Sequence, residues 1–142
     1  MFEIKVKYMD GVEPLEPIYE GDWIDLRCSK DLAIYQGEHG IIPLGVAMEL
    51  PVGYEALVLP RSSTFKNYGL ILTNSCGVID ECYNGDNDWW GFPFYATRTI
   101  ELPKNTRIAQ FRIIEHQPEL HFKTVERLGN ANRGGFGSTG VK

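Results

Sequence analysis

Apolar and polar residues alternate along several short stretches of this chain, and this alternation restricts its fold more than any other feature. In the first stretch, Phe2, Ile4 and Val6 would share one face while charged residues share the other. A period of two is typical of a half-buried β-strand. The pattern predicts further strands at about Ile41–Leu50, Tyr54–Leu59, Ile108–Ile114 and Leu120–Val125, with a less regular one at about Phe92–Leu102.

Turn-forming residues separate these stretches at short intervals. Residues 10–11 and 84–85 are Asp-Gly and Asn-Gly, in which glycine accepts a positive φ, and Pro51 and Pro103 each begin a turn with a preset φ. Many short strands joined by such turns are typical of an all-β barrel or jelly roll. One helical turn is expected after Arg61, in the stretch SSTFKNYG.

The chain has the length of a single domain. Single domains commonly contain about 100–150 residues, and this chain has 142. The alternation is lost from about Arg127 onward, where glycines become frequent. Because glycine loses more backbone freedom on ordering than any other residue, such a segment does not favour a terminal strand or helix. We therefore expect a β-barrel domain at residues 1–126 and a flexible C-terminal arm at residues 127–142.

Charge and cysteine content exclude several classes of function. The net charge of -5 gives no electrostatic attraction to nucleic acid, so we expect no nucleic-acid partner. Cys28, Cys76 and Cys82 include no Cys-x-x-Cys pair, which argues against a disulfide framework and against a zinc site. The N-terminal stretch has no long apolar run, so we expect no membrane partner and a cytoplasmic location.

The glycine-rich stretch NRGGFGSTGVK carries groups that suit a nucleotide. Arg133 offers a planar fork of donors to phosphate oxygens, Ser138 and Thr139 add hydroxyl donors, and backbone amides such as that of Gly137 can approach an anion closely. Phe136 could stack on a base. The alternative is a disordered linker, since many glycine-rich ends are no more than that.

Two further stretches carry polar groups that suit the same chemistry. LPRSS places Arg61, Ser62 and Ser63 directly after an expected strand, where they form a donor cluster or a solvated turn. CGVIDECYNGD places Asp80 three residues before Tyr83, at an expected hairpin. This carboxylate could activate a water beside a ring that packs on a sugar; the alternative is an aspartate that caps a turn and a tyrosine in the core.

Two more stretches carry polar residues: TRIAQ contains Arg107 and Gln110, and DWIDL contains Asp25. Together with the three stretches described above, they resemble the five motifs of the trimeric dUTP pyrophosphatase (dUTPase) family. The resemblance covers about residues 21–140. Four of the five motifs fit closely. The first departs from the family pattern, because Trp23 stands where the family usually has glycine.

The resemblance implies an activity, a cofactor and an assembly. Family enzymes hydrolyse dUTP to dUMP and pyrophosphate with Mg²⁺, which limits uracil incorporation into DNA and supplies dUMP for dTMP synthesis. They are jelly-roll-like homotrimers with active sites between subunits, and the arm of one subunit closes over a site built by the other two. The Mg²⁺ would be held mainly by substrate phosphates and waters, with no direct protein ligand.

The resemblance also implies roles for individual residues. Asp80 would be the general base, and Tyr83 would pack under the deoxyribose and exclude a 2′-hydroxyl. Asn74, Gly77 and Ile79 would belong to the slot that reads uracil. The phosphates or metal-bound waters would be contacted by Arg61, Ser62, Ser63 and Gln110, with support from Asp25 and Arg107. In the arm, the γ-phosphate would be bound by Arg133, Ser138 and Thr139, with Gly137 among the substrate-binding residues, and Phe136 would cover the base.

Several alternatives remain open at this point. The aromatic stretch DNDWWGFPFY suits either the barrel core or a trimer contact, but Trp89, Trp90 or Phe92 could instead lie beside the uracil and share its cover with Phe136. A dCTP deaminase is disfavoured, because the strand GFPFYA has Pro93 where that enzyme needs an acidic residue. The main alternative function is a nucleotide-sensing regulatory protein of the same fold that signals to a protein partner.

Overall fold

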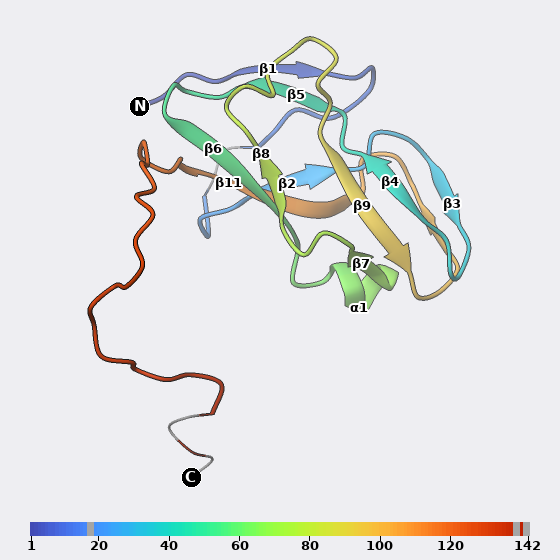
Figure 1. Cartoon of the computed structure of the whole chain (residues 1–142). Helices are drawn as coiled ribbons and strands as arrows, with labels where there is room; N and C mark the ends of the chain where they lie inside the picture. The colour runs from blue at the N-terminus through green and yellow to red at the C-terminus, as the bar shows by residue number, and fades with distance from the viewer. Residues whose placement is uncertain (17–18, 138–139, 141–142) are drawn as a thin grey trace.

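The computed structural model describes residues 1–16, 19–137 and 140. Within these residues the chain forms eleven short strands and one helix, so the predicted all-β class is confirmed (Figure 1). The elements are β1 (Lys5–Tyr8), β2 (Ile24–Arg27), β3 (Leu32–Ile34), β4 (His39–Pro43), β5 (Val46–Glu49), β6 (Tyr54–Pro60), α1 (Thr64–Tyr68), β7 (Leu70–Leu72), β8 (Gly77–Ile79), β9 (Gly91–Ala96), β10 (Ile100–Leu102) and β11 (Arg107–Glu115).

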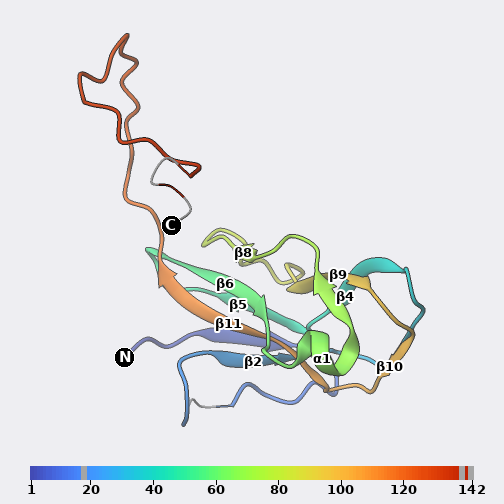
Figure 2. The same cartoon turned by 90° about the horizontal axis from the view of Figure 1, so that it is seen from below.

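All strand pairs are antiparallel, and the strand order is jelly-roll-like (Figures 1 and 2). The largest sheet has the order β2-β11-β6-β8, and a second sheet has the order β4-β9-β7. Two further pairs, β1 with β5 and β10 with β3, complete the described strands. The largest sheet positions the candidate site, because it contains or adjoins most of the polar residues singled out by the sequence.

The core is mostly aliphatic but contains the aromatic side chains Trp90, Phe92, Phe94 and Phe111. Trp90 and Phe92 are 1% and 0% exposed, and the Trp90 ring packs edge-on against Phe111 with centroids 5.2 Å apart. Burial disfavours Trp90 and Phe92 as rings that lie beside the uracil, because both side chains are packed into the core of their own domain. Trp89, the preceding residue, is only half-buried and remains a candidate.

Three predicted strands differ from those observed. The stretch expected as one strand at about Phe92–Leu102 is divided into β9 and β10 by residues 97–99. The stretch expected as one strand at Ile41–Leu50 is divided into β4 and β5 at Gly45, which has a φ of 68° and no room for a side chain: an added Cβ would lie 2.6 Å from Val12 Cγ2. The strand expected at Leu120–Val125 is absent. Both end residues of that stretch are exposed, and the segment pairs with no described strand.

The chain after β11 leaves the sheets, and both views show it running away from the domain (Figures 1 and 2). His116 donates its backbone N–H to the Gly53 carbonyl at 3.0 Å. Beyond His116, the described residues of this segment form no hydrogen bond to the domain. The chain therefore leaves the sheets where β11 ends, and the domain boundary expected between residues 126 and 127 stays a prediction.

Two further observations concern the described residues as a whole. No helix among them has the length and apolar character needed to cross a membrane. All three cysteines are free thiols, and burial raises the pKa of the Cys28 thiol.

Candidate active site

An arginine cluster lies where β6 ends, and we use that name for Asp25, Arg61, Arg107 and Gln110. The register of β2 and β11 places Asp25 opposite Gln110, and Arg61 directly follows β6, the other neighbour of β11. Arg61 Nε lies 2.9 Å from Asp25 Oδ1, and Arg107 lies 3.5 Å from the other oxygen of the same carboxylate. Gln110 donates through Nε2 to the Pro60 carbonyl at 3.1 Å.

The turn after β6 is fixed by one buried hydroxyl. Thr64, 0% exposed, accepts the backbone N–H of Arg61 at 2.9 Å and donates to the Ile108 carbonyl at 2.7 Å. Ser63 is the N-cap residue of α1 but makes no side-chain capping bond, and Ser62 is exposed. The expected helical turn after Arg61 is thus confirmed, and it presents both serine hydroxyls beside the arginine cluster.

Thr64 is a residue that the sequence motifs missed, and its contacts predict a measurable effect. We expect Thr64→Val to lower the free energy of unfolding by about 1–3 kcal/mol, because the Arg61 amide and the Ile108 carbonyl lose a buried partner. Urea unfolding followed by fluorescence measures this difference. Thr64→Ser keeps the hydroxyl and is the matched control; equal losses in both variants would contradict the assignment.

A second group of residues lies after β8 around a depression of about 140 Å³, which we call the Asp80 pocket. Asp80 is exposed, and its carbonyl accepts the backbone N–H of Tyr83 at 3.0 Å. The Tyr83 hydroxyl donates to the Trp89 carbonyl at 2.9 Å. The loop is thereby closed on itself, with a carboxylate and two aromatic rings at its rim. The residues that line the pocket are Val78, Ile79, Asp80, Tyr83, Trp89, Trp90 and Gly91.

Strand β8 is an edge strand with one free side. It pairs with β6 alone in the described sheet, and that pairing places Gly77 opposite Val58 and Ile79 opposite Ala56. Backbone donors and acceptors on the other side of an edge strand are available to a partner. Asn74, in the turn before β8, is exposed. This edge therefore offers unpaired backbone N–H and C=O groups, the kind of groups expected in a slot that reads uracil.

The Asp80 pocket and the arginine cluster lie at opposite ends of β6 within one chain. Asp80 follows Ile79, which pairs with Ala56, whereas Arg61 lies five residues beyond Ala56. At about 3.3 Å per residue the separation along β6 is roughly 17 Å. The two groups are also separated across the sheet. Arg61 contacts Asp25 on β2, and β2 lies three strand spacings, or about 14 Å, from β8. Figure 1 shows β8 and β6 running in opposite directions, with α1 beyond the far end of β6.

The arm residues lie apart from both groups. Arg133 and Phe136 are exposed, and the guanidinium of Arg133 approaches only the neighbouring Gly134 carbonyl, at 3.5 Å. Gly137 lies in the same exposed segment. Ser138 and Thr139, which were expected to bind phosphate, lie outside the described residues.

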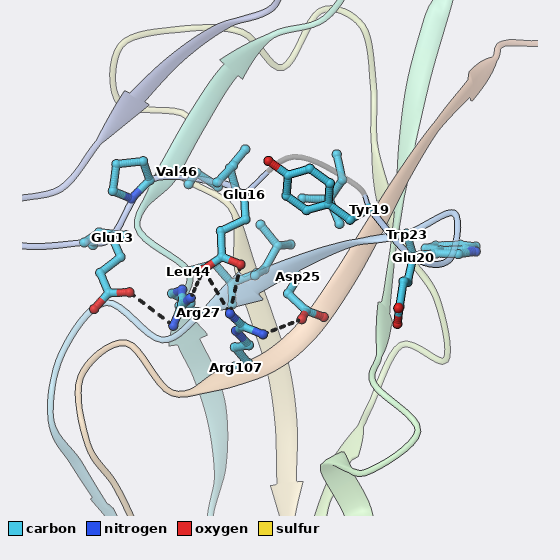
Figure 3. Close-up of a pocket in the computed structure, with 15 residues that line it drawn as sticks. Glu13, Glu16, Tyr19, Glu20, Trp23, Asp25, Arg27, Leu44, Val46 and Arg107 are labelled. Carbon is cyan, nitrogen blue, oxygen red and sulfur yellow. Dashed lines mark hydrogen bonds and ion pairs between the residues drawn. The ribbon is translucent and has the colours of Figure 1, made fainter.

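A cavity of about 290 Å³ adjoins the arginine cluster under the loop before β2 (Figure 3). Glu16 in that loop accepts from Arg107 Nη2 with both carboxylate oxygens, at 2.9 and 3.0 Å, and from Arg27 at 2.9 Å. No sequence signal singled out Glu16, because it stands alone between prolines and outside the five motifs. Its role becomes visible only when the loop is seen against β2 and β11.

No group of three or more metal-ligating side chains occurs in the part of the chain that the structure describes. The residues present fit a Mg²⁺ ion that arrives with a triphosphate. Asp25 and the Gln110 carbonyl oxygen can accept hydrogen bonds from metal-bound waters, and Mg²⁺ prefers phosphate oxygens and water to an all-protein cage.

The dUTPase family model matches residues 18–140, and the chain therefore belongs to the dUTPase family. It is 56% identical, over 99% of both chains, to the SPbeta prophage-derived deoxyuridine 5′-triphosphate nucleotidohydrolase YosS of Bacillus subtilis strain 168. It is 34% identical to a deoxyuridine 5′-triphosphate nucleotidohydrolase of Clostridium acetobutylicum, over 100% of this chain and 99% of that one.

Solved structures show the same fold. The dUTPase of Staphylococcus bacteriophage 80alpha, solved with dUPNHPP, has a TM-score of 0.81 with 23% identity, covering 99% of this chain and 100% of that chain. Phage dUTPases of that kind are described as controlling the transfer of virulence genes. These findings confirm the family and the jelly-roll-like fold that the motifs predicted.

Proposed function

We propose that this protein hydrolyses dUTP to dUMP and pyrophosphate, which limits uracil incorporation into DNA and supplies dUMP for dTMP synthesis. The observation that carries the proposal is the combination of membership in the dUTPase family with an exposed Asp80 beside the free edge of β8. The relative with 56% identity is named for the same activity.

Asp80 acts as the general base. Its carboxylate takes a proton from a water whose oxygen forms a bond to the α-phosphorus, and the bond from that phosphorus to the bridging α,β-oxygen breaks. Pyrophosphate carries away the electron pair of that bond. The Asp80 side chain is exposed, so its carboxylate is accessible to that water.

Base and sugar are recognised along β8. The free backbone groups of this edge, with the Asn74 side chain, bind the acceptor–donor–acceptor edge of uracil, and the narrow slot rejects the thymine methyl group. Tyr83, fixed by its hydrogen bond to the Trp89 carbonyl, packs under the deoxyribose and leaves no room for a 2′-hydroxyl. Gly77 and Ile79 form the floor of this slot, since both are buried.

The arginine cluster binds the triphosphate. Arg61 contacts Asp25 through Nε, which leaves its terminal nitrogens to donate to phosphate oxygens beside the Ser62 and Ser63 hydroxyls. Arg107 and Asp25 support this layer. Asp25 and Gln110 would hold the waters of a phosphate-bound Mg²⁺ ion, which would supply positive charge for the leaving pyrophosphate.

The working site is shared between copies in a homotrimer. Asp80 and Arg61 lie too far apart in one chain to act on one triphosphate, but copies related by a threefold axis can bring the two groups together. The arm of a further copy closes the site, with Phe136 over the uracil and Arg133, Gly137, Ser138 and Thr139 on the phosphates. Substrate then provides the contacts that order the arm.

Phe136 tests the closing role of the arm. We expect Phe136→Ala to raise KM for dUTP at least about fivefold, because base stacking contributes about 1–3 kcal/mol. Steady-state pyrophosphate release measures this change. Phe122→Ala, which removes another exposed ring of the same arm, is the control and leaves KM unchanged. An unchanged KM for Phe136→Ala would assign the cover to another ring, of which Trp89 is the remaining candidate.

A nucleotide panel with Mg²⁺ tests the overall proposal. Purified protein is expected to release pyrophosphate from dUTP and far more slowly from dTTP, dCTP and UTP. Binding of dUTP without turnover would instead support the regulatory alternative, which no contact of the described residues favours. The three free thiols agree with the proposed cytoplasmic location.

A further inference from the structure

Glu16 neutralises two arginines that face each other across neighbouring strands. Arg27 on β2 and Arg107 on β11 are directly opposite in register, and like charges in that position repel. The Glu16 carboxylate binds both guanidinium groups, with one contact to Arg27 at 2.9 Å and two to Arg107 at 2.9 and 3.0 Å (Figure 3). Glu16 precedes residues 18–140, which match the family model, so this contact comes from outside the matched region.

The contact continues through the arginine cluster as an alternating row of charges. Arg107 Nη2 binds Glu16, and Arg107 Nη1 lies 3.5 Å from Asp25 Oδ2. The other oxygen of Asp25 lies 2.9 Å from Arg61 Nε. Each carboxylate thus lies between two guanidinium groups. The row ends at Arg61, the residue that we assign to phosphate binding.

Both terminal nitrogens of Arg107 in this row face carboxylates. Glu16 occupies Nη2 with both of its oxygens, and Asp25 lies against Nη1. Without Glu16, the guanidinium of Arg107 would be free to form a two-pronged pair with Asp25, a geometry that carboxylates and guanidinium groups favour. Asp25 would then be drawn from Arg61, because both arginines would compete for the same two oxygens.

We propose that Glu16 is a positioning residue that limits Arg107 to one contact with Asp25 and so keeps Asp25 aligned with Arg61. This inference rests on the proposed role of Arg61 in binding the triphosphate. It predicts that Glu16 acts on the affinity for phosphates, not on the proton transfer at Asp80 and not on recognition of the base. Although Glu16 is 61% exposed, its contacts belong to a network of several charges, a case in which surface ion pairs have a measurable effect.

The test is Glu16→Gln, with Glu13→Gln as the matched control. Glu13 lies in the same loop and also contacts Arg27, at 3.4 Å, but its carboxylate makes no ion pair with Arg107. We expect Glu16→Gln to weaken binding of α,β-imido-dUTP about three- to tenfold and to raise KM for dUTP similarly, with kcat within about twofold. Binding of dUMP, which lacks the β- and γ-phosphates, stays unchanged, and Glu13→Gln behaves as the unchanged protein.

A second variant distinguishes alignment from general loss of structure. A lysine at position 107 cannot form a two-pronged pair with Asp25. We therefore expect Glu16→Gln to reduce imido-dUTP affinity less in a protein that already carries Arg107→Lys than in the unchanged protein. If Glu16→Gln weakens imido-dUTP binding equally with and without Arg107→Lys, the inference is overturned. Unchanged imido-dUTP affinity in Glu16→Gln, or an equal loss of dUMP affinity, would overturn it too. Arg61→Ala separates the two proposals: if it retains full imido-dUTP affinity, the phosphate role of Arg61 fails whatever Glu16 does.

Discussion

Asp80→Asn is expected to lower kcat for dUTP hydrolysis by about 10²–10⁴-fold, because positioned proton transfer contributes a factor of that size. The amide has nearly the same shape as the carboxylate but cannot accept the proton of the attacking water. Asp80 is exposed, and its side chain forms no hydrogen bond or ion pair within the described residues, so we expect the substitution to leave the fold intact. Pyrophosphate release measures the loss, and calorimetry with α,β-imido-dUTP shows whether binding is kept.

Asp86→Asn is the matched control for this prediction. Asp86 lies in the same loop after β8 and is also exposed, but it does not line the Asp80 pocket. It contributes its backbone carbonyl to Lys7, a contact that the substitution retains. We expect its kcat to match that of the unchanged protein. Full activity in Asp80→Asn would rule out the general-base assignment.

The second large effect is recovery of activity when two inactive variants are mixed. A chain with Asp80→Asn keeps its arginine cluster, and a chain with Arg61→Ala keeps its carboxylate. If each site takes Asp80 from one copy and Arg61 from another, random assembly of equal amounts makes about one quarter of the sites complete. We therefore expect refolded mixtures to recover about that fraction of the activity, although each variant alone has almost none.

The composition of the mixed assemblies must be verified, and native mass spectrometry does this directly. A chain that carries both substitutions, mixed with either single variant, is the control and restores nothing, since one of the two groups is then missing everywhere. Mixed trimers that remain inactive would contradict a shared site. They would show that each copy uses its own Asp80 with its own Arg61, against the separation along β6.

The alternation of residues predicted most of the strands because each has its partner in the same domain. It failed at Leu120–Val125, whose apolar side chains find no partner strand within the described residues. Alternation reports which face of a segment is apolar, but not which strand it pairs with. The division of β4 from β5 was equally hidden, since it depends on the space between Gly45 and Val12 and not on either residue alone.

The candidate site was predictable in its members but not in its geometry. The motifs named Asp80 and Arg61, and nothing in their spacing indicated that one chain keeps them at opposite ends of β6. Neighbouring Trp89 and Trp90 looked alike in sequence, yet only Trp90 is enclosed in the core. Glu16 carried no motif at all, because its importance arises from two arginines that are distant in sequence and opposite in register.

The arm that leaves the domain after β11 also has a consequence for the lifetime of the protein. Lys123, Arg127 and Arg133 are exposed along a segment without regular structure, which is the form of backbone that trypsin-like proteases cleave. A cut at any of them detaches Phe136 and the glycine-rich end. If nucleotide folds the arm onto the site, as we propose, it would protect these bonds, and the abundance of intact enzyme would follow the supply of the nucleotide it consumes.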